Sequence, residues 1–324
     1  MSLDVHGRTL LVHHWDTDGI CSARLLFEEL RDVSAENRTL RIGNYFLTEE
    51  ELVDFSGYDS IIIADMVLPV ENVLRLAEGS EVTIFDHHIQ PPIESVIQHN
   101  PIAMGAEPDD HPSASWVVSE FLGREIDLYT LLGMVGDREH RIKENERFWP
   151  IISEFCLEYG MAFDDMLRMV ELLDSNYKTG DKRAVEMAPR LLLESGGPSD
   201  ILENREWNRN VELLEEEMDR LLNLPSEDML GVTVKRITTQ YNIISALTRK
   251  LAWGSGRSVM VVNTGFFEDS DQLYVRSPDR DMRALIERAV GLGFKAGGKK
   301  DVMGAIVPKE ETEGLLKEAS EYLG

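Results

Sequence analysis

The sequence predicts an α/β protein with an N-terminal parallel-sheet domain, helices on both faces of that sheet, a helical connector and a smaller C-terminal α/β domain. Short apolar runs alternate with amphipathic stretches over the first half of the chain, and apolar strands joined by helices are typical of a parallel sheet covered on both faces. The chain has 324 residues, which is enough for about two domains. We expect the first domain at 1–190, the connector at 191–227 and the second domain at 228–324.

The N-terminal domain is expected to open with a buried strand followed by a helix. Residues 9–12 form the short apolar run that predicts the strand. Over 20–30, Ala23, Phe27 and Leu30 are spaced by four and three residues, which places them on one face of a helix. Later apolar runs predict strands at 59–65, 81–86 and 131–135, with a short helix at 70–77.

The middle of the chain, roughly 145–225, is acidic and helical in pattern, and its longest expected helix covers 203–222. Beyond about residue 228, short apolar runs return and predict the second domain. We expect Trp116 and Trp253 in the core rather than as base-stacking surfaces. The expected elements of the second domain are strands at 229–237, 259–262 and 272–276, a helix at 242–253 and a glycine-rich stretch at 291–300.

The composition narrows the class of partner. The chain has 33 Lys and Arg against 59 Asp and Glu, and its formal charge of −26 excludes a broad attraction to nucleic acid through net charge. Cys21 and Cys156 have no metal-binding spacing, so neither a disulfide scaffold nor a structural zinc site is expected. We see no signal peptide and no apolar stretch long enough to span a membrane, and therefore expect a cytoplasmic protein.

Acidic and histidine side chains follow four apolar runs, at points where the carboxyl ends of parallel strands meet at one edge of a sheet. A single Asp at such a point is usually a helix cap or turn residue. Several carboxylates gathered together are costly unless a cation compensates them, so four such points favour a metal site. Carboxylates with a few imidazoles suit Mn²⁺ or Mg²⁺ in a two-metal arrangement. The side chains that follow the four runs are His14, Asp16, Asp18, Asp65, Asp86, His87, His88 and Asp137. Gly19 is expected to permit a sharp turn into the first helix.

These four motifs, over residues 8–140, resemble those of the DHH phosphoesterase family. The family includes RecJ-like nucleases, oligonucleotide and cyclic-dinucleotide phosphodiesterases, exopolyphosphatases and pyrophosphatases. The resemblance implies a metal-binding catalytic domain at 1–190 and two divalent ions, with Mn²⁺ as the first choice and Mg²⁺ as the alternative. By the same resemblance, His14 and Asp16 would hold one ion, Asp18, His87 and Asp137 the other, and Asp65 would bridge them.

The resemblance also implies catalytic roles for two residues. Asp65 would act as the bridging carboxylate beside the attacking water, and His88 would face the substrate to stabilise or protonate the developing charge. Asp86 is expected behind these groups, where it would orient an imidazole or the following turn.

The second domain carries a separate resemblance, to the substrate-binding domain attached to many DHH proteins. An Arg-Ser pair follows a predicted strand, and a Gly-Gly pair precedes Lys299, where the family has His. Between 276 and 300 there are seven Lys or Arg against three Asp or Glu, which suits a phosphate, although a solvated basic face with a glycine turn explains the pattern as well. The predicted substrate-binding residues, in a glycine loop and beside it, are Arg276, Ser277, Gly297, Gly298, Lys299 and Lys300.

Taken together, the sequence predicts a metal-dependent phosphoesterase that hydrolyses phosphodiester bonds by two-metal activation of water. A RecJ-like single-strand exonuclease or a short-oligonucleotide phosphodiesterase is the first interpretation. An exopolyphosphatase or small-nucleotide phosphatase is the alternative, and a catalytically inactive replication scaffold or nucleotide-binding module is an alternative of a different class. A homodimer and replication or repair partners stay open.

Overall fold

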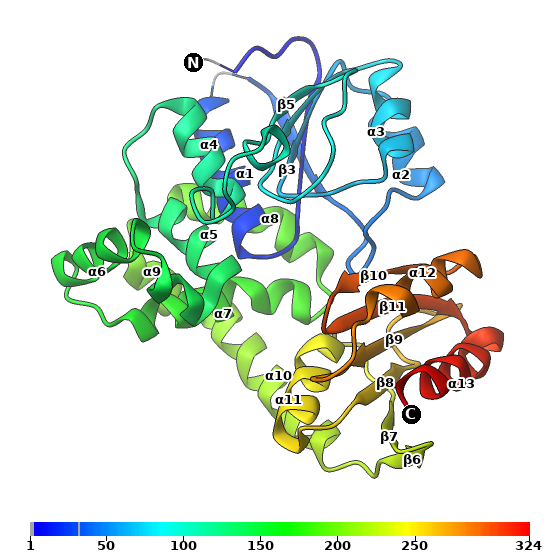
Figure 1. Ribbon diagram of the computed structural model, residues 1–324. Coiled ribbons are helices and arrows are strands. Elements are labelled where there is room, and N and C mark those ends of the chain that lie inside the picture. The colour runs from blue at the N-terminus through cyan, green and yellow to red at the C-terminus, as the bar shows by residue number, and fades with distance from the viewer. Residues whose placement is uncertain (1–2, 32) are drawn as a thin grey trace. The chain divides into compact units, whose positions relative to one another are not determined.

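The computed structural model describes residues 3–31 and 33–324, and the chain divides into two compact units (Figure 1). The first unit comprises Met1–Tyr177 and Asp181–Val211, and the second comprises Lys178–Gly180 and Glu212–Gly324. Among the described residues, no helix combines the length and the apolarity that a membrane crossing requires. Each unit has its own sheet.

The first unit is built on a five-stranded parallel sheet in the order β2-β1-β3-β4-β5. Two of its inner strands, β1 and β3, are buried along their whole length and pair from Thr9 opposite Ser60 to His13 opposite Ala64. The strands predicted near 9–12, 59–65 and 81–86 are therefore confirmed, and two further strands flank them. The strands are β1 (Thr9–His13), β2 (Ala35–Thr39), β3 (Ser60–Ala64), β4 (Glu81–Phe85) and β5 (Ile97–His99).

Helices cover both faces of this sheet, as predicted (Figure 1). On one face, α1 (Thr17–Glu29) packs against α4 (Ala114–Leu122), α5 (Leu128–Arg138) and α8 (Lys182–Glu194). On the other face lie α2 (Glu49–Phe55) and α3 (Val70–Ala77), which pack against each other. Parallel strands need crossover connections, and α1, α2 and α3 lie in those that join β1 to β2, β2 to β3 and β3 to β4.

The strand predicted at 131–135 is wrong, because these residues lie in α5. A short apolar run is compatible with a buried strand and with a buried helix, so its periodicity does not separate the two. Asp127 favours the helix locally, because its side chain accepts hydrogen bonds from the backbone N–H groups of Tyr129 and Thr130 and caps the N-terminus of α5.

The remaining elements of the first unit are helical, and the boundary between the units falls within α10. That helix agrees with the prediction at 203–222. These elements are η1 (Ile102–Met104), η2 (Glu139–Glu144), α6 (Phe148–Glu158), α7 (Phe163–Lys178), α9 (Pro198–Leu202) and α10 (Arg205–Leu222).

The second unit contains a six-stranded mixed sheet in the order β10-β11-β9-β8-β7-β6, in which only β7 and β8 pair in parallel within the described sheet. One apolar cluster packs α12 and α13 on one face, and another packs α11 and the second half of α10 on the opposite face. The smaller α/β domain is thus confirmed as a fold. Its elements are β6 (Glu227–Met229), β7 (Val232–Ile237), α11 (Ile244–Ser255), β8 (Val259–Asn263), β9 (Ser270–Arg276), α12 (Arg283–Gly291), β10 (Lys295–Lys299), β11 (Val302–Pro308), η3 (Lys309–Glu311) and α13 (Thr312–Leu323).

A buried lysine joins α10 to this sheet. The ammonium group of Lys235, on β7, donates to the backbone carbonyls of Leu221, Leu222 and Leu224 at 3.1, 3.0 and 2.5 Å. These carbonyls belong to the end of α10 and the residues just after it, where a helix leaves acceptors unpaired and favours positive charge. Burial lowers the pKa of Lys235, and the three carbonyls satisfy its donors.

Candidate metal centre

The first group of predicted ligands lies where β1 passes into α1. Asp16 caps α1, since its carboxylate accepts a hydrogen bond from the backbone N–H of Gly19 at 3.2 Å. The Nδ1 atom of His14 lies 2.8 Å from Oδ2 of Asp16 and 3.7 Å from Oδ2 of Asp65. These three side chains each offer a ligand atom, and the three atoms lie within 4.8 Å of one another.

Gly19 has a different role from the predicted one. It lies inside the first turn of α1, and it is not among the described glycines with a positive φ, so it makes no sharp turn. A Cβ atom at this position would come closer than 3.0 Å to the carbonyl oxygen of His14. Glycine is therefore required for space, because α1 packs directly on the backbone that carries His14.

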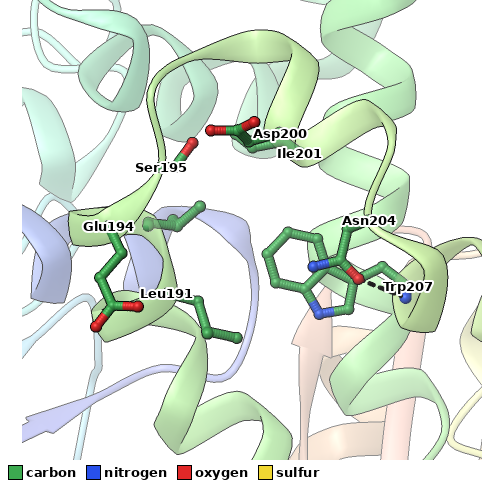
Figure 2. A pocket seen from close by; sticks show the side chains of 8 residues that line it. Leu191, Glu194, Ser195, Asp200, Ile201, Asn204 and Trp207 are labelled. Atoms are coloured by element: carbon green, nitrogen blue, oxygen red, sulfur yellow. Dashed lines mark hydrogen bonds between the residues drawn. The ribbon is translucent and has the colours of Figure 1, made fainter.

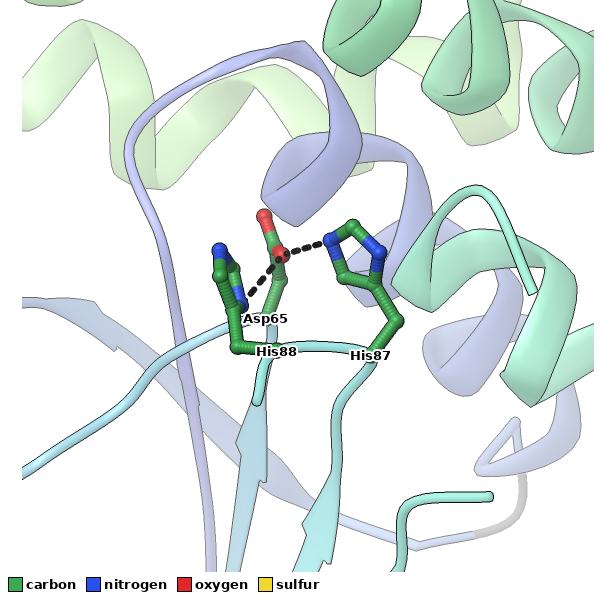
Figure 3. Close-up of side chains that lie close together, drawn as sticks. All are labelled: Asp65, His87 and His88. Carbon is green, nitrogen blue, oxygen red and sulfur yellow. Dashed lines mark ion pairs between the residues drawn. The ribbon is translucent and has the colours of Figure 1, made fainter. Parts of the chain in front are cut away.

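Asp65 occupies the centre of the site. It follows β3 with φ of 62°, a left-handed conformation that Asp and Asn tolerate better than most residues. Its side chain is buried, with Oδ2 toward His14, Oδ1 3.5 Å from Nε2 of His87, and Oδ1 3.9 Å from Nδ1 of His88. Figure 3 shows the two imidazoles on either side of this carboxylate.

The second group of predicted ligands gathers Asp18, His87 and Asp137 around the other side of Asp65. Nε2 of His87 lies 2.9 Å from Oδ2 of Asp137 and 3.8 Å from Oδ2 of Asp18. Asp18 lies in the first turn of α1, and its carboxylate falls in the group of His87 and Asp137 rather than in that of His14 and Asp16. Asp137 comes from the last turn of α5 rather than from a strand end.

Asp18 is fixed by backbone groups of another helix. It is fully buried, and its carboxylate accepts hydrogen bonds from the N–H groups of Ala114 and Ser115 at 2.6 and 3.0 Å. These donors belong to the first turn of α4, where N–H groups are free and negative charge is favoured. The start of α4 thus holds this carboxylate in one orientation.

Two glycines of α5, which the sequence analysis did not single out for this role, let that helix approach the site. A Cβ atom on Gly133 would lie closer than 3.0 Å to Oδ1 of Asp18 and to Oγ of Ser115. A Cβ atom on Gly136 would lie 3.1 Å from Cβ of Thr17. The spacing of these glycines, one turn apart and just before Asp137, is the signal that could have found them.

Thr17 and Asp174 form a further contact that sequence reasoning missed. The backbone N–H and the hydroxyl of Thr17 lie 3.0 and 2.8 Å from Oδ1 of Asp174, which comes from α7. Thr17 stands between the predicted ligands Asp16 and Asp18, so this contact ties α7 to the turn that carries both. The two partners are 157 positions apart, and no local pattern connects them.

The gathered charges shift the pKa values of the site. Burial, followed by repulsion from Asp18 and Asp16, raises the pKa of Asp65 well above the ordinary Asp range. Burial and the charge of Asp137 raise the pKa of Asp18 to about 6. Burial acts to lower the pKa of His87, but the neighbouring Asp137 and Asp65 outweigh it and raise that pKa well above 6.5. Without a cation, the site therefore retains protons that a metal ion would displace.

The residues present fit a pair of divalent ions. Within residues 3–31 and 33–324, both buried carboxylate oxygens of Asp65 lack a hydrogen bond. Nδ1 of His14 and Nε2 of His87 form ion pairs with the carboxylates of Asp16 and Asp137, at 2.8 and 2.9 Å. Buried carboxylate oxygens without a hydrogen bond are costly unless something satisfies them. Oxygen donors with a few imidazole nitrogens suit Mn²⁺ or Mg²⁺, and the four carboxylates of the two groups match the charge of two such ions.

His88 and Asp86 lie beside the two groups. Nδ1 of His88 is 2.8 Å from Oδ1 of Asp86, which is fully buried and also accepts a hydrogen bond from Gln90. The side chain of His88 is 46% exposed, in contrast to that of His87, so it faces solvent while Asp86 orients its ring.

In the second unit, the predicted substrate-binding residues lie around a hairpin. Arg276 ends β9, is nearly buried, and donates to Oδ2 of Asp301 at 2.8 Å. Its guanidinium also lies over the ring of Trp253, with 5.8 Å to the ring centroid. The prediction for Trp253 is wrong, because its side chain is 51% exposed, whereas Trp116 is buried as expected.

The glycine-rich segment is not the loop that was expected. Gly297, Gly298 and Lys299 lie on β10, the edge strand of the sheet, which pairs with β11 through a turn at Lys300 and Asp301. An edge strand presents unpaired backbone groups along its outer side. Ser277 lies next to this turn, since its backbone N–H donates to the carbonyl of Asp301 at 3.1 Å.

A separate pocket in the first unit contains none of the predicted site residues (Figure 2). It has a volume of about 180 Å³ and lies among α8, α9 and the start of α10. Ligand pockets usually measure about 300–1,000 Å³. Its lining is mainly apolar, with Leu191, Ile201 and Trp207 among its residues, and we assign it no ligand.

This chain was compared with protein families, with curated proteins and with solved structures. Residues 8–142 match the model of the DHH family, N-terminal domain. No curated protein matches the chain. Solved structures of similar fold include the exonuclease RecJ bound to manganese, with 18% identity, a TM-score of 0.64, and coverage of 98% of this chain and 90% of that one.

Two other structures are similar along 98% of this chain. A DHH domain from a protein described as belonging to a family of ribosomal proteins has 17% identity, a TM-score of 0.68 and 87% of its own length covered. The pGpG-specific phosphodiesterase PggH from Vibrio cholerae has 14% identity, a TM-score of 0.50 and all of its length covered. The fold is thus shared with these proteins, and residues 8–142 of this chain match the model of the DHH family, N-terminal domain.

Proposed function

We propose that this protein is a divalent-metal-dependent phosphoesterase that hydrolyses phosphodiester bonds in single-stranded or short oligonucleotides. The observation that carries the proposal is the position of Asp65, whose two buried oxygens face His14 on one side and His87 on the other. A carboxylate placed between two groups of ligands is suited to bridging two ions. Residue roles within the site are part of this proposal.

When bound, a pair of Mn²⁺ or Mg²⁺ ions supplies a nucleophilic water near neutral pH and offsets the negative charge on phosphorus. The chain's own residues prepare this site. The N–H groups at the start of α4 hold Asp18, and Asp86 orients the imidazole of His88. Because His88 is half-exposed, its free ring nitrogen can reach a substrate and deliver a proton to the leaving oxygen.

The substrate class rests on chemistry in both units and on the similar structures. A RecJ described as an exonuclease and a phosphodiesterase described as pGpG-specific share the fold, and both names denote phosphodiester substrates. In the second unit we propose that Arg276, Ser277, Gly297, Gly298, Lys299 and Lys300 bind a phosphate of the substrate. An arriving phosphate would compete with Asp301 for the guanidinium of Arg276.

A substrate panel with Mn²⁺ tests the proposal. It compares 5′-labelled and 3′-labelled DNA and RNA of two to twenty nucleotides, cyclic dinucleotides and polyphosphate, with EDTA as the metal-free condition. We expect turnover of short or single-stranded oligonucleotides that EDTA abolishes and that Asp65→Asn lowers at least roughly 100-fold.

Asp181→Asn is the matched control, because it changes a helix-capping carboxylate on α8 that lies in neither ligand group. We expect it to retain wild-type turnover. Activity that survives in EDTA, or wild-type turnover by Asp65→Asn, would contradict the proposal.

A further inference from the structure

A tryptophan and an arginine lie in contact within the second unit. Trp253, near the end of α11, has a side chain that is 51% exposed. The guanidinium of Arg276, at the end of β9, lies over the indole, with 5.8 Å between the guanidinium carbon and the ring centroid. Because tryptophan is on average a highly buried residue type, an indole exposed beside a cation is a candidate binding surface.

The packing of α11 holds Trp253 in place. Leu247 and Ala252, the residue directly before Trp253, are buried in the apolar cluster that joins α11 to the sheet. The helix also packs on β8 and on β9, the strand that ends at Arg276. The indole is thus presented from an anchored helix, which lowers the entropy cost of using it in binding.

The surroundings of Arg276 favour an anion. Its side chain is only 9% exposed, and its Nη1 atom donates to Oδ2 of Asp301, whereas its Nε atom, among the described residues, is buried without a hydrogen bond. Burial lowers the pKa of Arg276, and Asp301 opposes this effect. The positive charge of Arg249, on the same helix as Trp253, adds to it. A bound anion would satisfy the Nε donor and offset the repulsion between the two guanidinium groups.

We propose that Trp253 is a stacking surface for the base of a substrate nucleotide whose phosphate is bound by Arg276. This inference rests on the proposed function, which assigns a phosphate to Arg276, and it narrows the substrate to nucleotides, because polyphosphate has no ring to stack. A nucleotide carries its base one sugar away from its phosphate, so an indole and a guanidinium side by side suit one bound nucleotide. Stacking is also independent of charge, which matters in a chain with a formal charge of −26, and every base has a π face.

Equilibrium binding to the full chain in EDTA tests the stacking. The probes are adenosine 5′-monophosphate and ribose 5-phosphate, which share the sugar and the phosphate and differ in the base. We expect the wild type to bind the adenosine probe about 5- to 150-fold more tightly, the range typical of one stacked base.

Three replacements of Trp253 separate the aromatic ring from its bulk. Trp253→Ala and Trp253→Leu should lose the preference for the adenosine probe and keep the affinity for ribose 5-phosphate. The leucine variant still places an apolar side chain beside Arg276, so it removes the ring but not the cover. Trp253→Phe should keep most of the preference, because it retains an aromatic face.

Two further variants complete the design. Arg276→Gln should weaken the binding of both probes, because both carry the phosphate. Tyr159→Ala is the matched control, since that tyrosine is 53% exposed but lies at the end of α6 in the first unit, and we expect it to keep both affinities. Thermal melting confirms that each variant is folded.

The possible failures are distinguishable. A wild type that binds the two probes equally or binds neither, or a Trp253→Ala protein that keeps the preference, overturns the stacking proposal. An equal loss of both probes in a folded Trp253→Ala protein also overturns it, because the indole would then act only by holding Arg276. Wild-type binding by Arg276→Gln would place the nucleotide elsewhere and overturn it as well. The proposed function is judged separately, by turnover of the substrate panel with Mn²⁺, which the binding assay does not use.

Discussion

Replacing Gly133 by alanine tests how α5 positions the metal centre. The added Cβ would come closer than 3.0 Å to Oδ1 of Asp18 and Oγ of Ser115. Neither neighbour is free to move. Asp18 is held by the N–H groups of Ala114 and Ser115, and Oγ of Ser115 lies 2.9 Å from Oγ of Ser113. Either the helix shifts outward or the carboxylate turns.

The expected change in the free energy of unfolding follows from two opposing contributions. Overpacking a closely packed interior costs about 1–3 kcal/mol. Alanine in place of glycine inside a helix offsets about 1 kcal/mol of that cost. We therefore expect Gly133→Ala to lose up to about 2 kcal/mol of stability. Because Asp18 is displaced, we expect Mn²⁺ affinity to fall about 10- to 100-fold, as is usual when a ligand loses its orientation.

Denaturant unfolding of the metal-free protein measures the stability, and isothermal titration with Mn²⁺ measures the affinity. Gly314→Ala is the control, since this glycine lies in α13 and a Cβ there would meet nothing within 4 Å. We expect this control to gain about 0.5–1 kcal/mol and to leave Mn²⁺ binding unchanged. If Gly133→Ala binds Mn²⁺ as tightly as the wild type does, the argument from close approach is refuted.

Two further predictions concern protons and hydrogen bonds at the site. Since the folded protein raises the pKa values of Asp65 and His87, the stability that they contribute without metal is full at acidic pH and is lost as the pH rises through those raised values. Urea unfolding at pH 8 without metal should therefore find Asp65→Asn more stable than the wild type. Added Mn²⁺ should stabilise only the wild type. An Asp65→Asn protein less stable than the wild type under metal-free conditions would count against this reasoning. Thr17→Val removes the hydroxyl that contacts Asp174, and titration with Mn²⁺ should show roughly 10-fold weaker binding. Thr130→Val is the control, because it removes an equivalent contact to a capping carboxylate, that of Asp127, which is not a predicted ligand. We expect this control to leave Mn²⁺ binding unchanged. Equal Mn²⁺ affinities in the two threonine variants would show that the Asp174 contact does not position the ligands.

The sequence predicted the parts of the fold that local pattern determines. The buried strands β1, β3 and β4 are continuous apolar runs, and the spacing in α1 and α10 is helical. In contrast, β2 has the polar sequence Ala-Glu-Asn-Arg-Thr and becomes a strand because β1 pairs with it. The same holds for β10, whose glycines predict a loop from sequence alone but form a strand because β11 pairs with them.

In the candidate site, too, some residues could be predicted from local sequence pattern and others could not. Polar residues after strands, such as Asp65 and His87, are visible in the sequence because an apolar run precedes them. The residues that hold the ligands are not visible, because their partners are remote in the chain. Gly133 acts on Asp18 because α5 packs on α1, and Asp174 acts on Thr17 through hydrogen bonds from α1 to α7, so both contacts exist only in the folded chain.

An anomalous difference map from crystals grown with Mn²⁺ tests the central claim most directly. The account predicts two peaks per chain, one within coordinating distance of His14 and Asp16 and one within coordinating distance of Asp18, His87 and Asp137, with Asp65 reaching both. Peaks located elsewhere, or no peak at millimolar Mn²⁺, would contradict it.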